Sequence, residues 1–339
     1  MERWTRSGLI VSLIGLVICI GTLIPGAGNA QTAQTTVNLL TMPPGLTNYT
    51  VSVAQGQLIS KKTNVKVVVQ PTQGQLVIPP MMENKDAETG TLAATATYWA
   101  YVGTGDYKKP HRSLRVLQAG ESIYFGTITR GDTNIKTIPD LKGKRVTYQV
   151  TSSLSRTIME KQFEAYGLDA KKDVKLQKAE DNAFAFRDLE SGRTDAVGGV
   201  TLGGSKMTEA ATKFKIVLLP FPADKATALQ KQVPGVFSAV SSSGYGVDVG
   251  VPCVGVPTLF IARADLNNDV AYTLVKALLE NYKELAQVNA SLAGWKPEVA
   301  VRELEVPYHP GAIKYFKEKG TWTQEMDKKQ QDLLKKFPN

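Results

Sequence analysis

The stretch "LKGKRVTYQVTSSLSRTIMEKQFEAYG" (residues 141–167) contains the unit from which the fold is predicted. Its β-favouring part, "RVTYQV", predicts a strand, and the turn "TSSLS" leads into an amphipathic helix over Arg156–Tyr166. Gly167 directly after this helix is a common helix stop. A strand, a tight turn and a helix in this order are typical of proteins in which helices cover a mainly parallel sheet.

The same alternation of strand-like and helix-like segments continues on both sides. A long helix is predicted over Asn268–Asn281. The pattern predicts an α/β fold, and because about 300 residues are too many for one ordinary core, we expect two lobes. No low-complexity linker separates them, so we expect crossing strands to join the lobes. The other predicted strands are "VNLLT" (37–41), "VKVVVQ" (65–70), "TLAATAT" (91–97), "RVLQAG" (115–120), "IYFGTITR" (123–130), "VKLQKA" (174–179), Ala196–Val200 and "TLFIAR" (258–263).

Residues 1–30 have the features of a secretory signal peptide. Arg3 and Arg6 are basic, an apolar core follows over Gly8–Ile24, and small residues precede a cleavage position after Ala30. An uncleaved membrane anchor remains the alternative, although the apolar run is slightly short for a full bilayer span. We expect cleavage after Ala30 and a periplasmic location.

The composition argues against a nucleic-acid partner. The formal net charge is +9, from 40 Lys and Arg against 31 Asp and Glu, but the lysines are dispersed rather than clustered. An exported protein also rarely meets nucleic acid. A basic surface of this kind suits the attraction of anionic solutes by long-range steering.

Residues that would catalyse a reaction or hold a metal are few. The chain has two histidines, His111 and His309, and Cys253 is the only cysteine outside the predicted signal peptide. The motifs HExxH, CxxC, GxSxG and a Walker loop are absent from the sequence. We therefore expect no enzyme activity, no metal, no cofactor and no intramolecular disulfide. We interpret Cys253 as a small buried hydrophobe, and we expect His111, in a basic loop, to face solvent.

Three polar loops follow predicted strands: "TMPPGLTNY" (41–49), "PTQGQ" (71–75) and "TSSLS" (151–155). In open α/β sheets, ligands bind beside the carboxyl ends of the strands, close to helix N-termini. These termini present free N–H groups and a partial positive charge, which suit a carboxylate. Ordinary turn and capping roles are the alternative for each loop. The aromatic cluster "TYWAY" (97–101) is interpreted either as a pocket wall or as core.

Most of residues 125–322 resembles one family of binding proteins. The segments that carry the resemblance are "IKTIPDLKGKRVTYQVTSS", "DLESGRTDAVGGV", "VGVPTLFIARADLNNDVAYTLVKALLEN" and, most specifically, "PYHPGAIKYFKEKGTW". In order and spacing they resemble the solute-binding proteins of TRAP transporters, TAXI branch. The resemblance implies a two-lobed periplasmic-binding-protein-like fold of type II with ligand in the interlobe cleft. Its implied boundaries are residues 31–125 plus 259–339 for lobe I and 126–258 for lobe II.

The resemblance also implies a function and a set of ligand contacts. The chain is expected to capture a small organic anion (an amino acid such as glutamate, a dicarboxylate or a keto acid) and to deliver it, as a monomer, to TRAP membrane subunits. The alternative is a protein of the same fold that serves an ABC importer or a sensor. The family's first two loops are replaced here by "MPPGLTNY" and "TQGQ". The implied contacts are Pro44, Thr47, Asn48, Tyr49, Gln75, Thr97, Tyr98, Ser152, Ser153, Ser155 and Gly199.

The sequence also bears on the role of His309 and on the group that holds the anion. His309 precedes Pro310, which fits an early helix position, so we interpret His309 as scaffold rather than as a catalytic base. The anion is expected at the helix N-terminus after "TSSLS", where serine hydroxyls and backbone N–H groups converge. Arg156 is the rival, because a guanidinium can hold a carboxylate with two hydrogen bonds.

Export of the chain is directly measurable. Cleavage after Ala30 would leave Gln31 as the first residue, because small residues at the −3 and −1 positions suit signal peptidase. Mass spectrometry of the exported protein is expected to give a mass that begins at Gln31. Recovery of an intact Met1 terminus in the membrane fraction would contradict this prediction and favour the anchored alternative.

Overall fold

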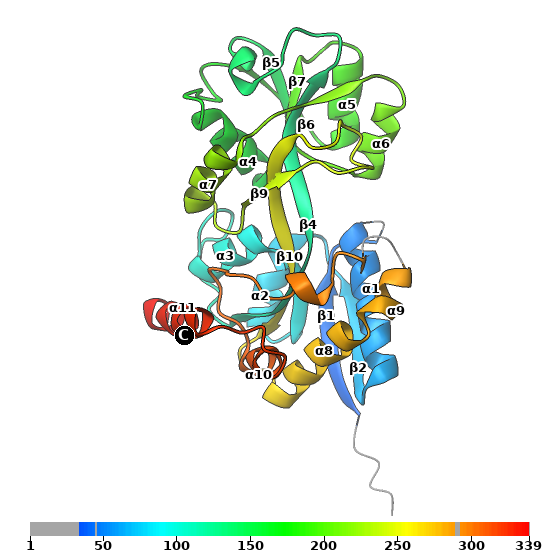
Figure 1. The fold of residues 1–339 in the computed structure, drawn as a ribbon, viewed down its shortest axis with the longest axis vertical. Coiled ribbons are helices and arrows are strands. Elements are labelled where there is room, and N and C mark those ends of the chain that lie inside the picture. Colours follow the sequence, from blue (N-terminus) through cyan, green and yellow to red (C-terminus); the bar gives the residue numbers. More distant parts are fainter. Residues whose placement is uncertain (1–33, 45, 289–291, 339) are drawn as a thin grey trace, which may run out of the picture. The chain divides into compact units, whose positions relative to one another are not determined.

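Two long antiparallel strands, β4 (Leu114–Arg130) and β10 (Pro252–Arg263), organise the sheet of the protein. Within the described residues the sheet has ten strands in the order β2-β1-β3-β10-β4-β7-β5-β6, with β8 paired to β4 and β9 to β10. Figure 1 shows β4 and β10 as a pair that joins two groups of shorter strands. The predicted signal peptide lies outside the described residues. The structure, a computed structural model, describes residues 34–44, 46–288 and 292–338.

Strands and helices alternate along most of the chain. The strands besides β4 and β10 are β1 (Thr35–Thr41), β2 (Val65–Pro71), β3 (Thr89–Ala93), β5 (Arg145–Gln149), β6 (Lys175–Ala179), β7 (Ala196–Thr201), β8 (Ile216–Leu219) and β9 (Phe237–Val240). The helices are α1 (Thr47–Lys62), α2 (Ile78–Glu83), α3 (Ala94–Val102), α4 (Ser153–Glu164), α5 (Asn182–Glu190), α6 (Ser205–Ala211), α7 (Ala223–Gln232), α8 (Asn268–Glu280), α9 (Tyr282–Val288), α10 (Pro310–Glu318) and α11 (Gln324–Lys336).

Each group of shorter strands is parallel. Strands β2, β1 and β3 pair in parallel on the β10 side of the sheet, and β6, β5 and β7 pair in parallel on the β4 side. Antiparallel pairing is confined to pairs that include β4 or β10. The prediction of an α/β fold with parallel strands flanked by helices is confirmed. The chain from Gln34 onward forms one compact unit, and the exact lobe boundaries stay a prediction.

The apolar core has two parts. The larger part includes Leu39, Leu92 and Leu259 of the central strands, and the smaller part includes Val197 and Cys253. Burial raises the pKa of the Cys253 thiol to about 12, so this side chain is the small buried hydrophobe that the sequence predicts. Within the described part of the chain, every helix is too short or too polar to cross a bilayer.

Strand β4 corrects one prediction, because "RVLQAG" and "IYFGTITR" belong to a single strand of 17 residues. Gly120 lies in its middle, where the sequence suggests a break. A Cβ atom at Gly120 would lie 2.2 Å from the Trp295 ring, so only glycine lets this ring lie flat on the strand. The glycine serves close packing here rather than a turn.

Two further boundaries differ from the prediction. Residues 91–97 do not form one strand, because β3 ends at Ala93 and α3 begins at Ala94, where alanine-rich sequence favours a helix. Strand β10 begins at Pro252, inside a stretch that reads as turns. Its second proline, Pro257, lies beside a register shift in the pairing with β4, which is a position that tolerates a missing N–H group.

His111 is buried, so the prediction that it faces solvent is wrong. Its side chain is 2% exposed and its ring packs edge-on against Tyr107 at 5.8 Å between centroids. The backbone N–H of His111 donates to the carbonyl oxygen of Ala100 at 2.8 Å, which folds the loop back onto α3. Tertiary packing of this basic loop could not be read from its composition.

His309 begins helix α10, as the sequence predicts. Its Nδ1 accepts a hydrogen bond from the N–H of Gly311 at 3.2 Å and caps the helix, while Pro310 occupies the first helical position. The N–H of His309 donates to the carbonyl oxygen of Val116 at 2.8 Å, which ties α10 to β4. Desolvation lowers the pKa of this fully buried imidazole to about 4.

The buried His309 makes stability depend on pH. Its pKa lies near 6.5 in the unfolded chain and at about 4 in the folded one, so the unfolded state binds more protons as pH falls between these values. This difference removes about 3 kcal/mol of stability across that range. We expect His309→Asn, which keeps a capping oxygen but does not titrate, to lose less melting temperature between pH 7.5 and pH 4.5 than the unmodified protein. Equal losses in the two proteins would contradict the prediction.

Candidate functional site

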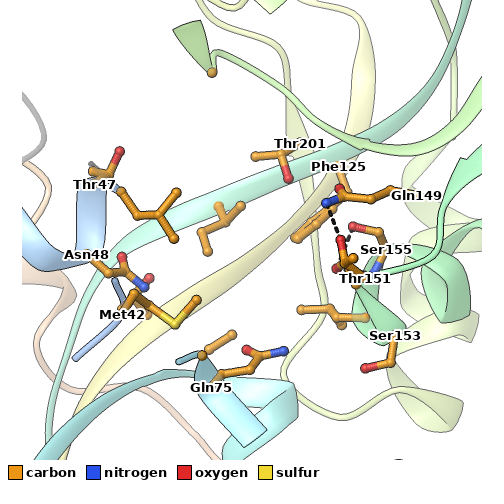
Figure 2. Close-up of a pocket in the computed structure, with 18 of the residues that line it drawn as sticks. Met42, Thr47, Asn48, Gln75, Phe125, Gln149, Thr151, Ser153, Ser155 and Thr201 are labelled. Carbon is orange, nitrogen blue, oxygen red and sulfur yellow. Dashed lines mark hydrogen bonds between the residues drawn. The ribbon is translucent and has the colours of Figure 1, made fainter. Parts of the chain in front are cut away.

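A pocket of about 880 Å3 opens at the carboxyl ends of the parallel strands β1, β2, β5 and β7. This volume falls within the range of small-molecule sites, and the place is the one at which open α/β sheets bind ligands. Figure 2 shows Met42, Thr47 and Asn48 on one side of the pocket, and Gln149, Thr151 and Ser155 on the other. The lining comes from residues 42–43, 46–48 and 51 and from the segments 73–77, 121–125, 149–155 and 201–204, with single residues from elsewhere.

One wall contains the start of helix α1. Thr47, Asn48 and Val51 of this helix line the pocket. Leu46 occupies the N-cap position and its side chain offers no capping acceptor, so the first N–H groups of α1 are left for another partner. No hydrogen bond among the described residues uses the amide N–H of Thr47 or Asn48.

Hydrogen bonds hold the backbone of the loop that follows β2, residues 72–75. The hydroxyl of Thr72 donates to the carbonyl oxygens of Thr41 and Gly74, at 2.9 and 3.1 Å. The hydroxyl of Tyr107 donates to the backbone oxygen of Gln75 at 3.2 Å. These bonds engage the backbone, and the Gln75 side chain has no hydrogen bond among the described residues.

The other wall contains the start of helix α4, which begins at Ser153, three residues before the predicted start. Ser152 caps this helix, because its Oγ accepts from the Ser155 N–H at 3.2 Å and donates to the Ser155 Oγ at 2.9 Å. The hydroxyl of Ser153 has no hydrogen bond among the described residues, and neither do the N–H groups of Ser153 and Leu154. Ser153 is therefore the serine of this turn that is available to a ligand.

Gly199 of β7 packs closely against the backbone of Ser155 in this turn. It lies in β7 with a φ of +65°, and a Cβ atom there would lie 2.0 Å from the carbonyl oxygen of Ser155. Both the backbone conformation and the close approach require glycine. The adjacent Gly198 plays a similar part, since a Cβ atom there would lie 2.3 Å from the Met159 sulfur. The glycine pair lets α4 pack onto β7 and fixes the position of its N-terminus.

The charges of the pocket are unexpected for an anion site. The lining contains no Lys, Arg or His among the described residues, and its two charged side chains, Asp106 and Glu121, are acidic. The partial positive charges at this pocket, within the described residues, are those of the N-termini of α1 and α4. Arg156 lies outside the lining, where its Nε donates to Glu160 at 2.9 Å and its guanidinium lies over the Tyr148 ring.

Glu121 is a carboxyl group in an unusual environment. It lies on β4 and packs against the segment that contains Gly294. A Cβ atom added to Gly294 would lie 2.6 Å from the Cβ of Glu121. Desolvation raises its pKa to about 7. No hydrogen bond or ion pair of the described residues satisfies this carboxyl group, so its charge is left for a ligand or for water.

The structure brings together some of the residues predicted to contact a ligand and separates others. Thr97 is buried in α3, where its hydroxyl donates to the Ala93 carbonyl oxygen, so it does not mark the end of a strand. The aromatic residues Trp99 and Tyr101 belong to the core. The predicted residues that line the pocket are Thr47, Asn48, Gln75, Ser152, Ser153 and Ser155, and those outside the lining are Pro44, Tyr49, Thr97, Tyr98 and Gly199.

Sequence reasoning missed the residues that β4 contributes. Glu121, Tyr124 and Phe125 line the pocket from this strand, and Trp295 and Tyr245 reach it from distant segments. No turn or motif marks them, because their position follows from the strand's path across the sheet. Within the described residues, no group of three or more His, Cys, Asp or Glu side chains is arranged to hold a metal ion.

Solved structures with similar folds are solute-binding proteins. PhnD1 from Prochlorococcus marinus, in complex with methylphosphonate, is 12% identical over 85% of this chain and all of its own, with a TM-score of 0.53. A putative periplasmic sulfonate-binding protein, SsuA of Methylobacillus flagellatus, is 13% identical over 90% of this chain and 95% of its own, with a TM-score of 0.51. A TctC solute-binding protein from Polaromonas is 13% identical over 77% and 87%, with a TM-score of 0.50.

At such identities these likenesses establish the fold alone: the chain has the α/β architecture of periplasmic solute-binding proteins. The family is shown by a different comparison. The model of the NMT1-like family matches residues 39–320, which include both walls of the pocket and the strands that join them. The chain belongs to the NMT1-like family.

Proposed function

We propose that this protein is an extracytoplasmic receptor that captures a small solute with a carboxylate group in the pocket and delivers it to a membrane importer. The observation that carries the proposal is the pair of helix N-termini, α1 and α4, which meet one pocket from two different groups of strands. The α/β architecture that the chain shares with periplasmic solute-binding proteins supports this role. Amino acids such as glutamate, dicarboxylates and keto acids are the candidate solutes.

The carboxylate is held by backbone and hydroxyl groups rather than by a basic side chain. At α4 the donors are the free N–H groups of Ser153 and Leu154 and the hydroxyl of Ser153. At α1 they are the free N–H groups and side chains of Thr47 and Asn48. Fixed donors of this kind hold an anion without the desolvation cost of a buried guanidinium.

Apolar side chains at the pocket support capture by closure. Leu46, Leu76, Val77 and Val150 are exposed large hydrophobic residues, and all four line the pocket. The first three belong to the segment assigned to lobe I, residues 31–125 plus 259–339, and Val150 belongs to lobe II, residues 126–258. Closing the lobes over a solute would bury this surface and add apolar stabilisation to the polar contacts.

The importer is proposed to be a TRAP permease, because the order of motifs resembles the TAXI branch. An ABC importer is the second candidate, since the putative SsuA neighbour is described as part of a sulfonate ABC transporter. The two differ in their energy source. We expect solute uptake in proteoliposomes with TRAP membrane subunits to depend on an ion gradient and to proceed without ATP. Uptake that requires ATP hydrolysis and an ATPase subunit would favour the ABC importer.

Solute binding is testable with a library of small carboxylates, amines and sugars. A ligand that binds the folded state alone raises the melting temperature, so we expect shifts from carboxylates and none from neutral sugars. The affinity of each hit is then measured for Ser153→Ala. A hydrogen bond to a charged group contributes about 1.5–3 kcal/mol, so the affinity is expected to fall roughly 10- to 150-fold without a change in melting temperature.

Ser152→Ala and Arg156→Ala are the matched controls for this experiment. Ser152 caps α4, so its loss should cost about 1 kcal/mol of stability and lower the melting temperature. Arg156 is paired with Glu160 outside the pocket, and its removal should leave the affinity unchanged. Loss of binding in Arg156→Ala together with normal binding in Ser153→Ala would overturn the helix-terminus account.

A further inference from the structure

Glu121 is the feature of the pocket that a carboxylate ligand leaves unexplained. A half-buried carboxyl group without a hydrogen bond or ion pair among the described residues loses hydration and gains nothing in return. A second carboxylate beside it would be repelled. The guanidinium of Arg302 does not compensate it, because that group lies over the Phe237 ring, 5.0 Å from the centroid, and forms no ion pair among the described residues.

Aromatic rings line the same pocket as this carboxyl group. Tyr124 and Tyr245 both line the pocket, with their ring centroids 5.2 Å apart and their planes inclined by 37°. Burial first, then Tyr124 and, to a smaller extent, the charge of Glu121 raise the pKa of Tyr245. Trp295 lines the same region and lies against Gly120, the residue before Glu121.

A carboxylate and aromatic rings in the lining of one pocket together suit one kind of ligand group. An ammonium ion forms a charge-assisted hydrogen bond with the carboxylate, and aromatic faces attract the same positive charge. A hydroxyl or a keto group supplies no counter-charge, so it would not stabilise the ionised form of Glu121. The pKa of about 7 is consistent with this requirement, because a bound cation would stabilise the ionised form that burial disfavours.

We propose that Glu121, with Tyr124 and Tyr245, forms a subsite for a cationic amine, so that the solute is a zwitterion rather than a dicarboxylate or a keto acid. This inference rests on the proposed function, because the carboxylate of the same solute occupies the helix N-termini. It assigns the two poles of the ligand to different parts of the pocket. The anionic pole contacts α1 and α4, and the cationic pole contacts β4.

Matched ligand pairs test the subsite. The probes are alanine with pyruvate, leucine with 4-methyl-2-oxopentanoate, glutamate with 2-oxoglutarate and phenylalanine with phenylpyruvate, each titrated calorimetrically into the purified protein. In every pair that binds, we expect the amino acid to bind roughly tenfold or more tightly than its 2-oxo partner, since only the amino acid carries the cation. A 2-oxo acid that binds as tightly as its amino acid would overturn the inference and leave the proposed function standing. Binding by no probe of either series would overturn both.

Two variants locate the effect. Glu121→Gln keeps the size of the side chain, removes the charge, and should reduce the preference for the amino acid to less than about threefold. Glu298→Gln makes the same change at an exposed residue outside the lining and should keep the full preference. The melting temperature of Glu121→Gln should equal or exceed that of the unmodified protein, because a desolvated carboxyl group is removed. A full preference in Glu121→Gln, or its loss in Glu298→Gln, would overturn the assignment to Glu121.

Discussion

The antiparallel pairing of β4 with β10 is the constraint on which the rest of the structure depends. Each strand continues from one group of parallel strands into the other, so the two groups share one sheet. The register shifts beside Pro257 and Phe260 let these long strands pair while they bend and twist. Because both groups end at the same pocket, the β4–β10 pair also sets which loops can contact one ligand.

In the proposed binding mode, the pocket separates two kinds of electrostatic recognition. Negative charge on a ligand is met by helix N-termini, whose donors are fixed by the helix itself and by the close packing of Gly199 on α4. Positive charge is met by the carboxylate of Glu121 on β4, in a lining that also contains the rings of Tyr124 and Tyr245. The orientation of a bound solute then follows from the difference between the walls, without a basic side chain in the lining.

Local sequence signals predicted the elements whose structure is decided locally. The turn at residues 151–155, the helix after it and the helix that His309 begins all have capping residues and turn residues within a few positions of each other. The predictions failed where packing overrides such signals. Gly120 reads as a strand end but seats Trp295, and residues 94–97 read as a strand but form the first turn of α3. The basic loop at His111 reads as exposed but packs on Tyr107.

By itself, the sequence determined the α/β class, the mainly parallel sheet, the polar loops at the strand ends and the buried cysteine, because periodicity, turn residues and composition act over short distances. Only the tertiary structure decided which of those loops share a pocket, that Arg156 is turned to Glu160, and that Glu121, unpaired among the described residues, lines the same pocket as Tyr245. These outcomes depend on contacts between residues far apart in the chain. Such contacts are fixed by how strands pair and helices pack, and no local pattern encodes them.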